Sequence, residues 1–220
     1  MPSCNNYFGK LFAHLAAVLA VSAVSSETSN IGSTMYGNST VLVKTIANLV
    51  ILFALMGGIF LTKPGGIPKY AFFIGFAFWF GQILKPYVTQ LKDKKILTNI
   101  LILTTGVFVG MMALGFYDNM NLLGFGPYLF AGLIGLILAQ LLVLALGTPE
   151  EKKQGFQFLR FFGIALFAAY TAYDVQVLRQ NAKMCRNIQK NLKMDPDYPV
   201  ESLALYLDFL NLFVKIGNNE

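Results

Sequence analysis

Two acidic residues, Asp174 and Asp208, lie inside apolar stretches of the chain, whereas the other Asp and Glu residues fall in polar segments or near the ends. An ionised carboxylate at the centre of a bilayer costs at least roughly 2.5 kcal/mol, so such residues usually face the interior of a helix bundle and serve an ion pathway, a proton relay or a counter-ion. Asp174 and Asp208 are therefore the candidate functional residues.

Each aspartate shares one helical face with other polar side chains, because residues three, four and seven positions apart lie on the same side of a helix. The two faces consist of Tyr170, Thr171 and Asp174, and of Asp208, Asn211 and Lys215. Polar faces on consecutive apolar helices are satisfied most simply when they face each other or a shared aqueous cavity. We therefore expect the two aspartates to approach one another.

Two adjacent carboxylates in an apolar environment do not both ionise readily, so one keeps its proton and the pair titrates in two coupled steps. The shared proton would latch the two helices together. Its loss would leave two like charges, which would loosen the latch or create a cation site, and carboxylate oxygens suit Ca²⁺. Asp174 and Asp208 thus form a predicted pH sensor, gate and Ca²⁺ site. The alternative is that each aspartate only satisfies a backbone group or a Tyr hydroxyl near a helix end.

The composition indicates an all-α membrane protein. Of 220 residues, 55% are hydrophobic and 13% are charged, which is about half the charged share of a soluble domain. A membrane-spanning helix needs about 20 apolar residues. We predict a single polytopic membrane domain over residues 1–220, built as a seven-transmembrane helical bundle with helices at about 8–24, 41–62, 70–91, 96–116, 127–147, 156–178 and 202–217.

Both ends of this bundle leave alternatives open. The first stretch is either a retained helix or a cleaved signal peptide, because small residues follow its apolar run. The last stretch is either a full span or a re-entrant segment sheltered by the bundle. Lys85-Pro86 is expected to kink or end the third helix. Polar composition predicts loops at 25–40, 63–69, 148–155 and 180–201.

The balance of Lys and Arg near the ends of the spans places the N-terminus inside, with eight basic residues on the inner side and five on the outer. Cys4 and Cys185 then both face the cytosol, and we expect two free thiols. The glycosylation sequon Asn38-Ser39-Thr40 lies outside but abuts the second helix, so we expect it to be unused.

Other features are assigned to packing or to the lipid. The net charge of +6 is consistent with anionic head groups, and no basic surface predicts nucleic-acid binding. His14 is expected to pack or to form hydrogen bonds rather than to ligate a metal. Gly106-x-x-x-Gly110 predicts close helix packing in the bundle or, as the alternative, a dimer contact. No phosphate loop, nucleophile elbow or His cluster occurs, so we expect neither enzymatic activity nor a cofactor.

The last two helices resemble the Bax inhibitor-1 family, also called the transmembrane Bax inhibitor motif family. The motifs are Ala172-Tyr173-Asp174-Val175-Gln176 and Leu205-Tyr206-Leu207-Asp208-Phe209-Leu210-Asn211-Leu212-Phe213. Weaker similarity extends over about residues 55–215. The resemblance implies a seven-helix bundle with a central last helix and residence in the endoplasmic reticulum or another intracellular membrane. It also implies a pH-sensitive Ca²⁺ leak that protects from cell death, with apoptosis-regulating membrane proteins as partners.

The same resemblance places the family's pH-sensing aspartates on Asp174 and Asp208, and a basic partner on Lys63. A lysine lacks the bidentate fork of an arginine. Val175 also departs from the family's usual Thr. Two other functions stay open: a membrane scaffold that modulates cell death through protein partners, and an intramembrane aspartyl protease. The protease is disfavoured because Asp208 follows Leu205-Tyr206-Leu207 instead of a Gly-x-Gly pattern.

Overall fold

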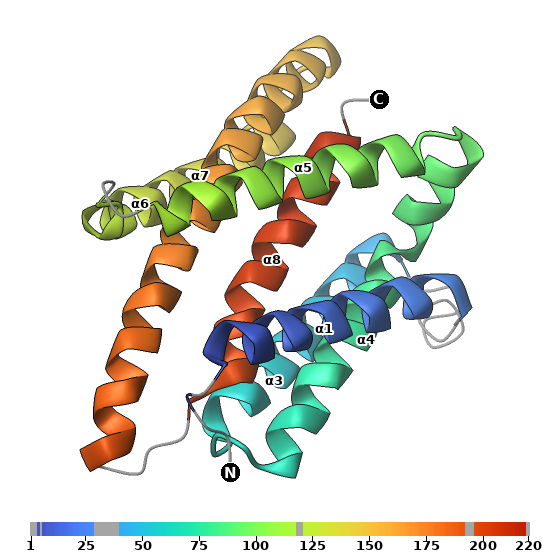
Figure 1. Cartoon of the computed structure of the whole chain (residues 1–220). Coiled ribbons are helices and arrows are strands. Elements are labelled where there is room, and N and C mark those ends of the chain that lie inside the picture. Colours follow the sequence, from blue (N-terminus) through green and yellow to red (C-terminus); the bar gives the residue numbers. More distant parts are fainter. Residues whose placement is uncertain (1–3, 5, 29–39, 118–120, 192–195, 219–220) are drawn as a thin grey trace. The chain divides into compact units, whose positions relative to one another are not determined.

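The computed structural model describes residues 4, 6–28, 40–117, 121–191 and 196–218, and in these ranges it is helical without strands. Each predicted apolar stretch lies within or largely overlaps one helix (Figure 1). They are α1 (Tyr7–Thr28), α3 (Val41–Leu61), α4 (Ile67–Asp93), α5 (Leu97–Phe116), the 3-10 helix η1 (Leu123–Phe125), α6 (Gly126–Leu146), α7 (Pro149–Asn191) and α8 (Tyr198–Gly217). Asn38 and Ser39 of the sequon lie outside the described residues, as does most of the predicted loop 25–40.

Six of the described helices are long and apolar enough to cross a membrane, namely α1, α3, α4, α5, α6 and α7. α8 is not among these six, and it carries Glu201, Asp208 and Lys215. The chain is therefore a multi-pass membrane protein. A seventh span, a re-entrant path for α8 and its central position stay predictions.

The predicted loop at 148–155 is wrong, because α7 already begins at Pro149. Thr148 and Glu151 form a reciprocal cap: the Thr148 backbone N–H donates to Glu151 Oε2 at 2.8 Å, and the Glu151 N–H donates to Thr148 Oγ1 at 3.4 Å. Pro149 takes the first helical position, where its missing N–H costs nothing. The Thr-x-x-Glu spacing was thus a helix start and not a loop.

The predicted loops at 180–201 and 63–69 are also wrong in part, because helices extend into both. α7 continues to Asn191 through the predicted loop 180–201, because residues 180–191 contain neither Gly nor Pro and so nothing stops the helix. α4 continues through Pro86 to Asp93, so this proline does not end the helix, and the alternative of a kink at Lys85-Pro86 stays a prediction. Ile67 and Pro68 open α4 inside the predicted loop 63–69.

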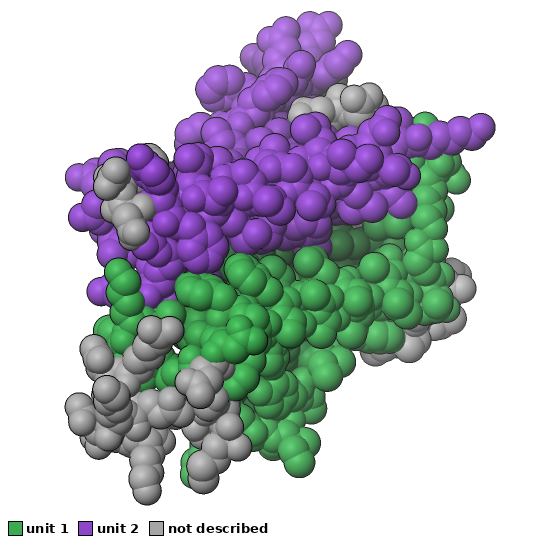
Figure 2. Space-filling view, viewed as in Figure 1, with its two compact units in different colours: residues 1–94, 182–206 green, residues 95–181, 207–220 purple. Residues whose placement is uncertain are grey.

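The helices group into two compact units, shown in different colours in Figure 2. Unit 1 comprises residues 1–94 and 182–206, and unit 2 comprises residues 95–181 and 207–220. By residue number, α1, α3 and α4 belong to unit 1, and α5, η1 and α6 belong to unit 2. α7 and α8 are each divided: α7 passes from unit 2 to unit 1 after residue 181, and α8 passes from unit 1 to unit 2 after residue 206.

Unit 1 is held together by hydrogen bonds between α1 and α4, which pack side by side. Ser22 Oγ donates to Ala77 O at 2.8 Å, and Ser25 Oγ donates to Phe78 O at 2.7 Å. Gly81 allows this approach, because a Cβ at that position would collide with Ser22 O and Ser25. Small and hydroxylated residues therefore join these helices, as expected where the hydrophobic effect does not drive helix association.

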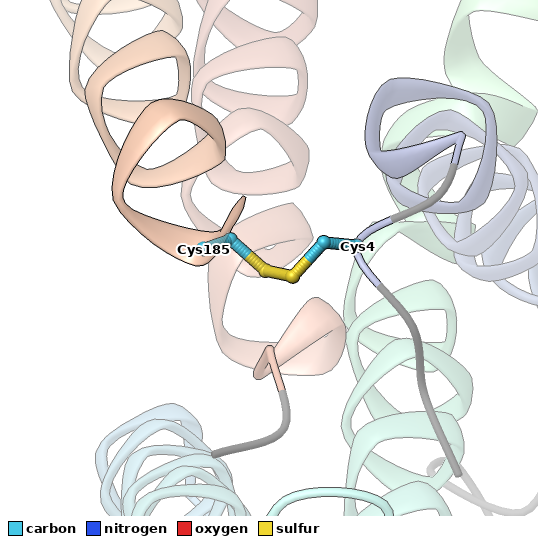
Figure 3. Close-up of a disulfide and its surroundings, with 2 residues drawn as sticks. All are labelled: Cys4 and Cys185. Carbon is cyan, nitrogen blue, oxygen red and sulfur yellow. A yellow bond between two sulfur atoms is a disulfide. The ribbon is translucent and has the colours of Figure 1, made fainter. Parts of the chain in front are cut away.

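A disulfide between Cys4 and Cys185 also lies in unit 1 (Figure 3). The prediction of two free thiols is wrong, since both cysteines of the chain are bonded. Their separation of 181 residues along the chain gave no indication that they meet. Only the fold brings the segment before α1 to the C-terminal part of α7.

The prediction of close helix packing at Gly106-x-x-x-Gly110 is not met by the described helices, but a later glycine of α5 does pack closely. Gly106 and Gly110 of α5 have no atom within 4 Å of an added Cβ, so among the described residues no neighbouring helix packs against this motif. Gly115 on the same helix is different, because a Cβ there would meet Ala172 O and Val175 of α7. Close packing of α5 therefore occurs at its C-terminal end, beside the turn of α7 that carries Asp174.

Candidate functional site

Asp174 of α7 and Asp208 of α8 lie in unit 2 with their carboxyl groups in side-chain contact. Asp208 is buried at 5% exposure, and Asp174 is half-buried. The expected approach of the two aspartates is thus present in the structure. Their role as a pH sensor or gate is a separate question, and it stays a prediction.

The Asp208 carboxyl group has an incomplete set of hydrogen-bonding partners among the described residues. Its Oδ2 is buried without a hydrogen-bonding partner among the described residues. Thr171, which is fully buried, contacts the same carboxyl group, but its hydroxyl donates to Phe167 O at 2.9 Å. A proton on either aspartate would supply the missing donor and turn a contact between two acceptors into a hydrogen bond. The contact between the two groups is therefore compatible with one shared proton, which stays a prediction.

The end of α5 and the segment after it hold the Asp174 turn of α7 in place. Besides the contact at Gly115, Arg179 donates from Nη1 to Gly115 O at 3.3 Å. Gln176 is buried at 6% exposure and accepts a hydrogen bond from the Leu122 backbone N–H at 2.7 Å. These contacts fix the rotation of α7, which points Asp174 toward α8 and not toward lipid.

α8 is positioned in unit 2 by contacts with the same two helices. Phe209, next to Asp208, packs edge-to-face on Phe108 of α5 with ring centroids 5.4 Å apart. Further along α8, the aliphatic stem of Lys215 lies against Gly163 of α7. α5 thus contacts both helices that carry the aspartates, at Gly115 and at Phe108.

The other predicted site residues have mixed outcomes. Tyr170 lies near both carboxyl groups, so it belongs to the cluster with Thr171. The Asn211 amide instead donates to Leu207 O at 2.8 Å, within its own helix. Lys63 is exposed, follows the end of α3 and belongs to unit 1, so its partnership with the aspartates stays a prediction.

Sequence reasoning missed two of the residues that position the site. Gln176 was noticed only as part of a motif, and Arg179 only as a basic residue at a helix end. A polar side chain two residues after Asp174 in an apolar helix was a usable signal, because a buried amide must find a partner. His14 behaves as expected: its Nδ1 contacts Lys10 O at 2.6 Å, and its ring stacks on Tyr70 and Tyr198.

The site offers few metal ligands. Within the described ranges, no group of three or more His, Cys, Asp and Glu side chains comes together. Ca²⁺ takes six to eight oxygen ligands, and the pair supplies carboxylate oxygens from two residues. The two carboxylates alone therefore supply fewer ligands than a bound Ca²⁺ ion takes.

Comparison with known proteins agrees with the motifs on α7 and α8. The family model Bax1-I, described as inhibitor of apoptosis-promoting Bax1, matches residues 4–218. An uncharacterized protein of Borreliella burgdorferi is 29% identical over 96% of this chain and 90% of its own length. Bax inhibitor 1 of Schizosaccharomyces pombe is 29% identical over 77% of this chain and 56% of its own length.

A vertebrate protein is similar as well. Protein lifeguard 4 of Mus musculus is 28% identical over 76% of this chain and 66% of its own length. The expected resemblance is confirmed, since the family model covers nearly the whole chain. The chain therefore belongs to the Bax inhibitor family and is one of its multi-pass membrane proteins.

Proposed function

We propose that this protein is a pH-sensitive Ca²⁺ leak channel of an intracellular membrane, gated by Asp174 and Asp208, and that the leak suppresses apoptosis. The observation that carries the proposal is the buried contact between the two carboxyl groups, with Asp208 Oδ2 lacking a donor. Family membership supports the link to cell death, since the family is described as inhibitor of apoptosis-promoting Bax1. No enzymatic step is part of the proposal.

The proposed gate works through one proton. With the proton shared, α7 and α8 are joined by an O–H···O⁻ hydrogen bond, which is shorter and stronger than a neutral one. When the proton leaves, two negative charges remain in contact in a poorly solvated place and repel each other. The same two charges attract Ca²⁺, whose hard oxygen preference they match. Opening and ion entry thus follow from a single deprotonation.

The deciding measurement is Ca²⁺ flux through the purified protein in liposomes at pH 6 and pH 8. The wild-type flux is expected to be higher at pH 8, where the shared proton is lost. Asp174→Asn with Asp208→Asn keeps both side chains neutral and of similar size. In this double variant, the flux is expected to be low and equal at the two pH values.

Asp93→Asn is the matched control, because Asp93 is an exposed acid at the end of α4. It removes one carboxylate without touching the pair, so wild-type pH dependence is expected. A flux that keeps its pH dependence in the double variant would exclude the gate. No flux in any variant would favour a scaffold that acts through membrane protein partners, and cleavage of a helical substrate that requires Asp174 would favour a protease.

We place the protein in the endoplasmic reticulum or another intracellular membrane, because a Ca²⁺ leak needs a store on one side. Fractionation of cells that express the tagged chain tests this placement. Co-sedimentation with the plasma membrane alone would contradict it.

A further inference from the structure

The disulfide joins two parts of unit 1 that are far apart in the chain. Cys4 precedes α1 and is buried at 4% exposure, whereas Cys185 lies in the C-terminal part of α7. Their Cα atoms are 5.9 Å apart. Figure 3 shows the bond as a bridge between Cys4, in the segment before α1, and Cys185 of α7. The start of α1 is therefore held covalently to α7.

A buried ion pair lies at the start of α8 in the same unit. Lys69, in the first turn of α4, is 1% exposed and pairs with Asp197, whose side chain is 26% exposed. Asp197 directly precedes α8 and accepts a hydrogen bond from the Val200 N–H at 3.4 Å on Oδ1. A buried ammonium depends on its partner, since an uncompensated buried charge is strongly unfavourable. Separation of Lys69 from Asp197 would therefore be energetically unfavourable.

The N-terminal half of α1 reaches the neighbours of this ion pair. Tyr7 contacts the ring of Tyr198 at 5.5 Å between centroids. His14 stacks on both Tyr70 and Tyr198, each at 5.6 Å. Tyr70 follows Lys69 in the sequence, and Tyr198 follows Asp197. The N-terminal half of α1 therefore contacts the residue next to each member of the ion pair.

The two halves of α1 are held by different kinds of contact. Ser22 and Ser25, in the C-terminal half, form buried or part-buried hydrogen bonds with α4. Gln82 adds two more, from Nε2 to the backbone oxygen and the hydroxyl of Ser25, each at 2.7 Å. The N-terminal half is joined by ring contacts and by the disulfide. Breaking the S–S bond would thus loosen one end of α1 while the other stays anchored.

We propose that the Cys4–Cys185 disulfide is a redox-controlled tether that keeps the start of α1 over the Lys69–Asp197 ion pair. The distribution of basic residues predicts that both cysteines face the cytosol. Disulfides in the cytosol are usually transient and redox-sensing, not permanent. The bond then forms when that compartment is oxidised and breaks when reduction is restored, and this change covers or uncovers the ion pair.

The opening step is thiol–disulfide exchange with a dithiol reductant. One thiolate of the reductant attacks a sulfur of the disulfide, the other cysteine leaves as a thiolate, and a mixed disulfide forms. The second thiol of the reductant then displaces the remaining cysteine. Two electrons and, after protonation, two hydrogens pass to Cys4 and Cys185, and the reductant ends as a cyclic disulfide. Reoxidation by a small-molecule thiol oxidant reverses the change.

The test combines thiol labelling with amine labelling of the full chain in detergent. Maleimide-polyethylene glycol is expected to add two labels to the denatured protein only after dithiothreitol treatment. An amine-acetylating reagent then reports on the ion pair, read by peptide mass spectrometry. Lys63 is exposed and serves as the internal reference. Reduction is expected to raise the ratio of Lys69 to Lys63 acetylation by about tenfold, and reoxidation is expected to restore it.

The variant Cys4→Ser with Cys185→Ser is expected to give the high ratio with and without reductant. If this variant does not fold, the cycle of reduction and reoxidation on the wild-type chain gives the same information. Two results would overturn the proposal: both cysteines labelled before reduction, or Lys69 acetylation unchanged when both thiols have become free. These readouts do not depend on Ca²⁺ flux, so the proposed channel function is tested separately.

Discussion

The hydroxyl of Tyr206 in α8 and Oγ of Ser22 in α1 are 2.6 Å apart, and both residues are buried in unit 1. Ser22 Oγ already donates to Ala77 O, so the Tyr206 hydroxyl is the donor of this bond. Tyr206 lies two residues before Asp208 in the same helix. A hydrogen bond in unit 1 is therefore connected to the candidate gate through one half-turn of α8.

Ser22→Ala is expected to destabilise the protein more than Tyr206→Phe does. Ser22→Ala leaves a fully buried tyrosine hydroxyl without its acceptor, at a cost of about 1–3 kcal/mol. Tyr206→Phe removes the donor, leaves Ser22 bonded to Ala77, and costs about 0.5–1.5 kcal/mol. The free energies of unfolding of the two variants, measured in detergent, give the order of the two losses. The reverse order of the two variants would contradict the assigned donor.

Gly115→Ala is expected to destabilise unit 2 by about 1–3 kcal/mol, the usual cost of overpacking. The new Cβ would meet the backbone oxygen of Ala172 and the side chain of Val175, so α5 must move away from the Asp174 turn. Gly110→Ala is the matched control on the same helix, because its Cβ meets nothing within 4 Å. In the control, alanine is expected to stabilise the helix by up to about 1 kcal/mol. Equal effects of the two substitutions on thermal unfolding would refute the close contact.

Lys69→Met is expected to cost roughly 2–4 kcal/mol, since it leaves Asp197 as a partly buried charge without its partner. Lys92→Met makes the comparison at the exposed pair of Lys92 and Glu27, whose side chains are 44% and 47% exposed. There the expected loss is below about 1 kcal/mol. Denaturant titrations of both variants measure the loss in free energy of unfolding. An equal loss in Lys92→Met and Lys69→Met would contradict a buried, partner-dependent Lys69–Asp197 ion pair.

The stability of the wild-type protein is expected to fall between pH 6 and pH 8. At low pH the shared proton satisfies Asp208 Oδ2, and at high pH its loss leaves a buried acceptor without a donor, at a cost of about 1–3 kcal/mol. Asp208→Asn stays neutral and supplies an N–H donor to Asp174, so its stability is expected to be nearly independent of pH. Thermal unfolding at several pH values measures this. A wild-type curve parallel to that of Asp208→Asn would exclude proton sharing.

The sequence by itself determined the membrane class, the approximate centres of the helices and the acidic pair, because each depends on local information. Runs of about 20 apolar residues require helices in a bilayer, and the cost of a charge in hydrocarbon singles out Asp174 and Asp208. The start of α7 was also readable from Thr148 and Glu151, although polar composition pointed to a loop. The predicted loop at 148–155 was wrong because the polar composition indicated a loop while the Thr148–Glu151 spacing indicated a helix start.

Only the tertiary structure decided which distant residues meet. The Cys4–Cys185 bond, the Lys69–Asp197 pair and the contact of Gly115 with α7 all join residues separated by dozens of positions or more. Such contacts depend on the rotation and depth of each helix, which many small packing terms set together. Hydropathy shows that a segment is buried or faces lipid, but it does not specify the partner. The aspartates were a partial exception, because buried charge strongly restricts what can lie beside it.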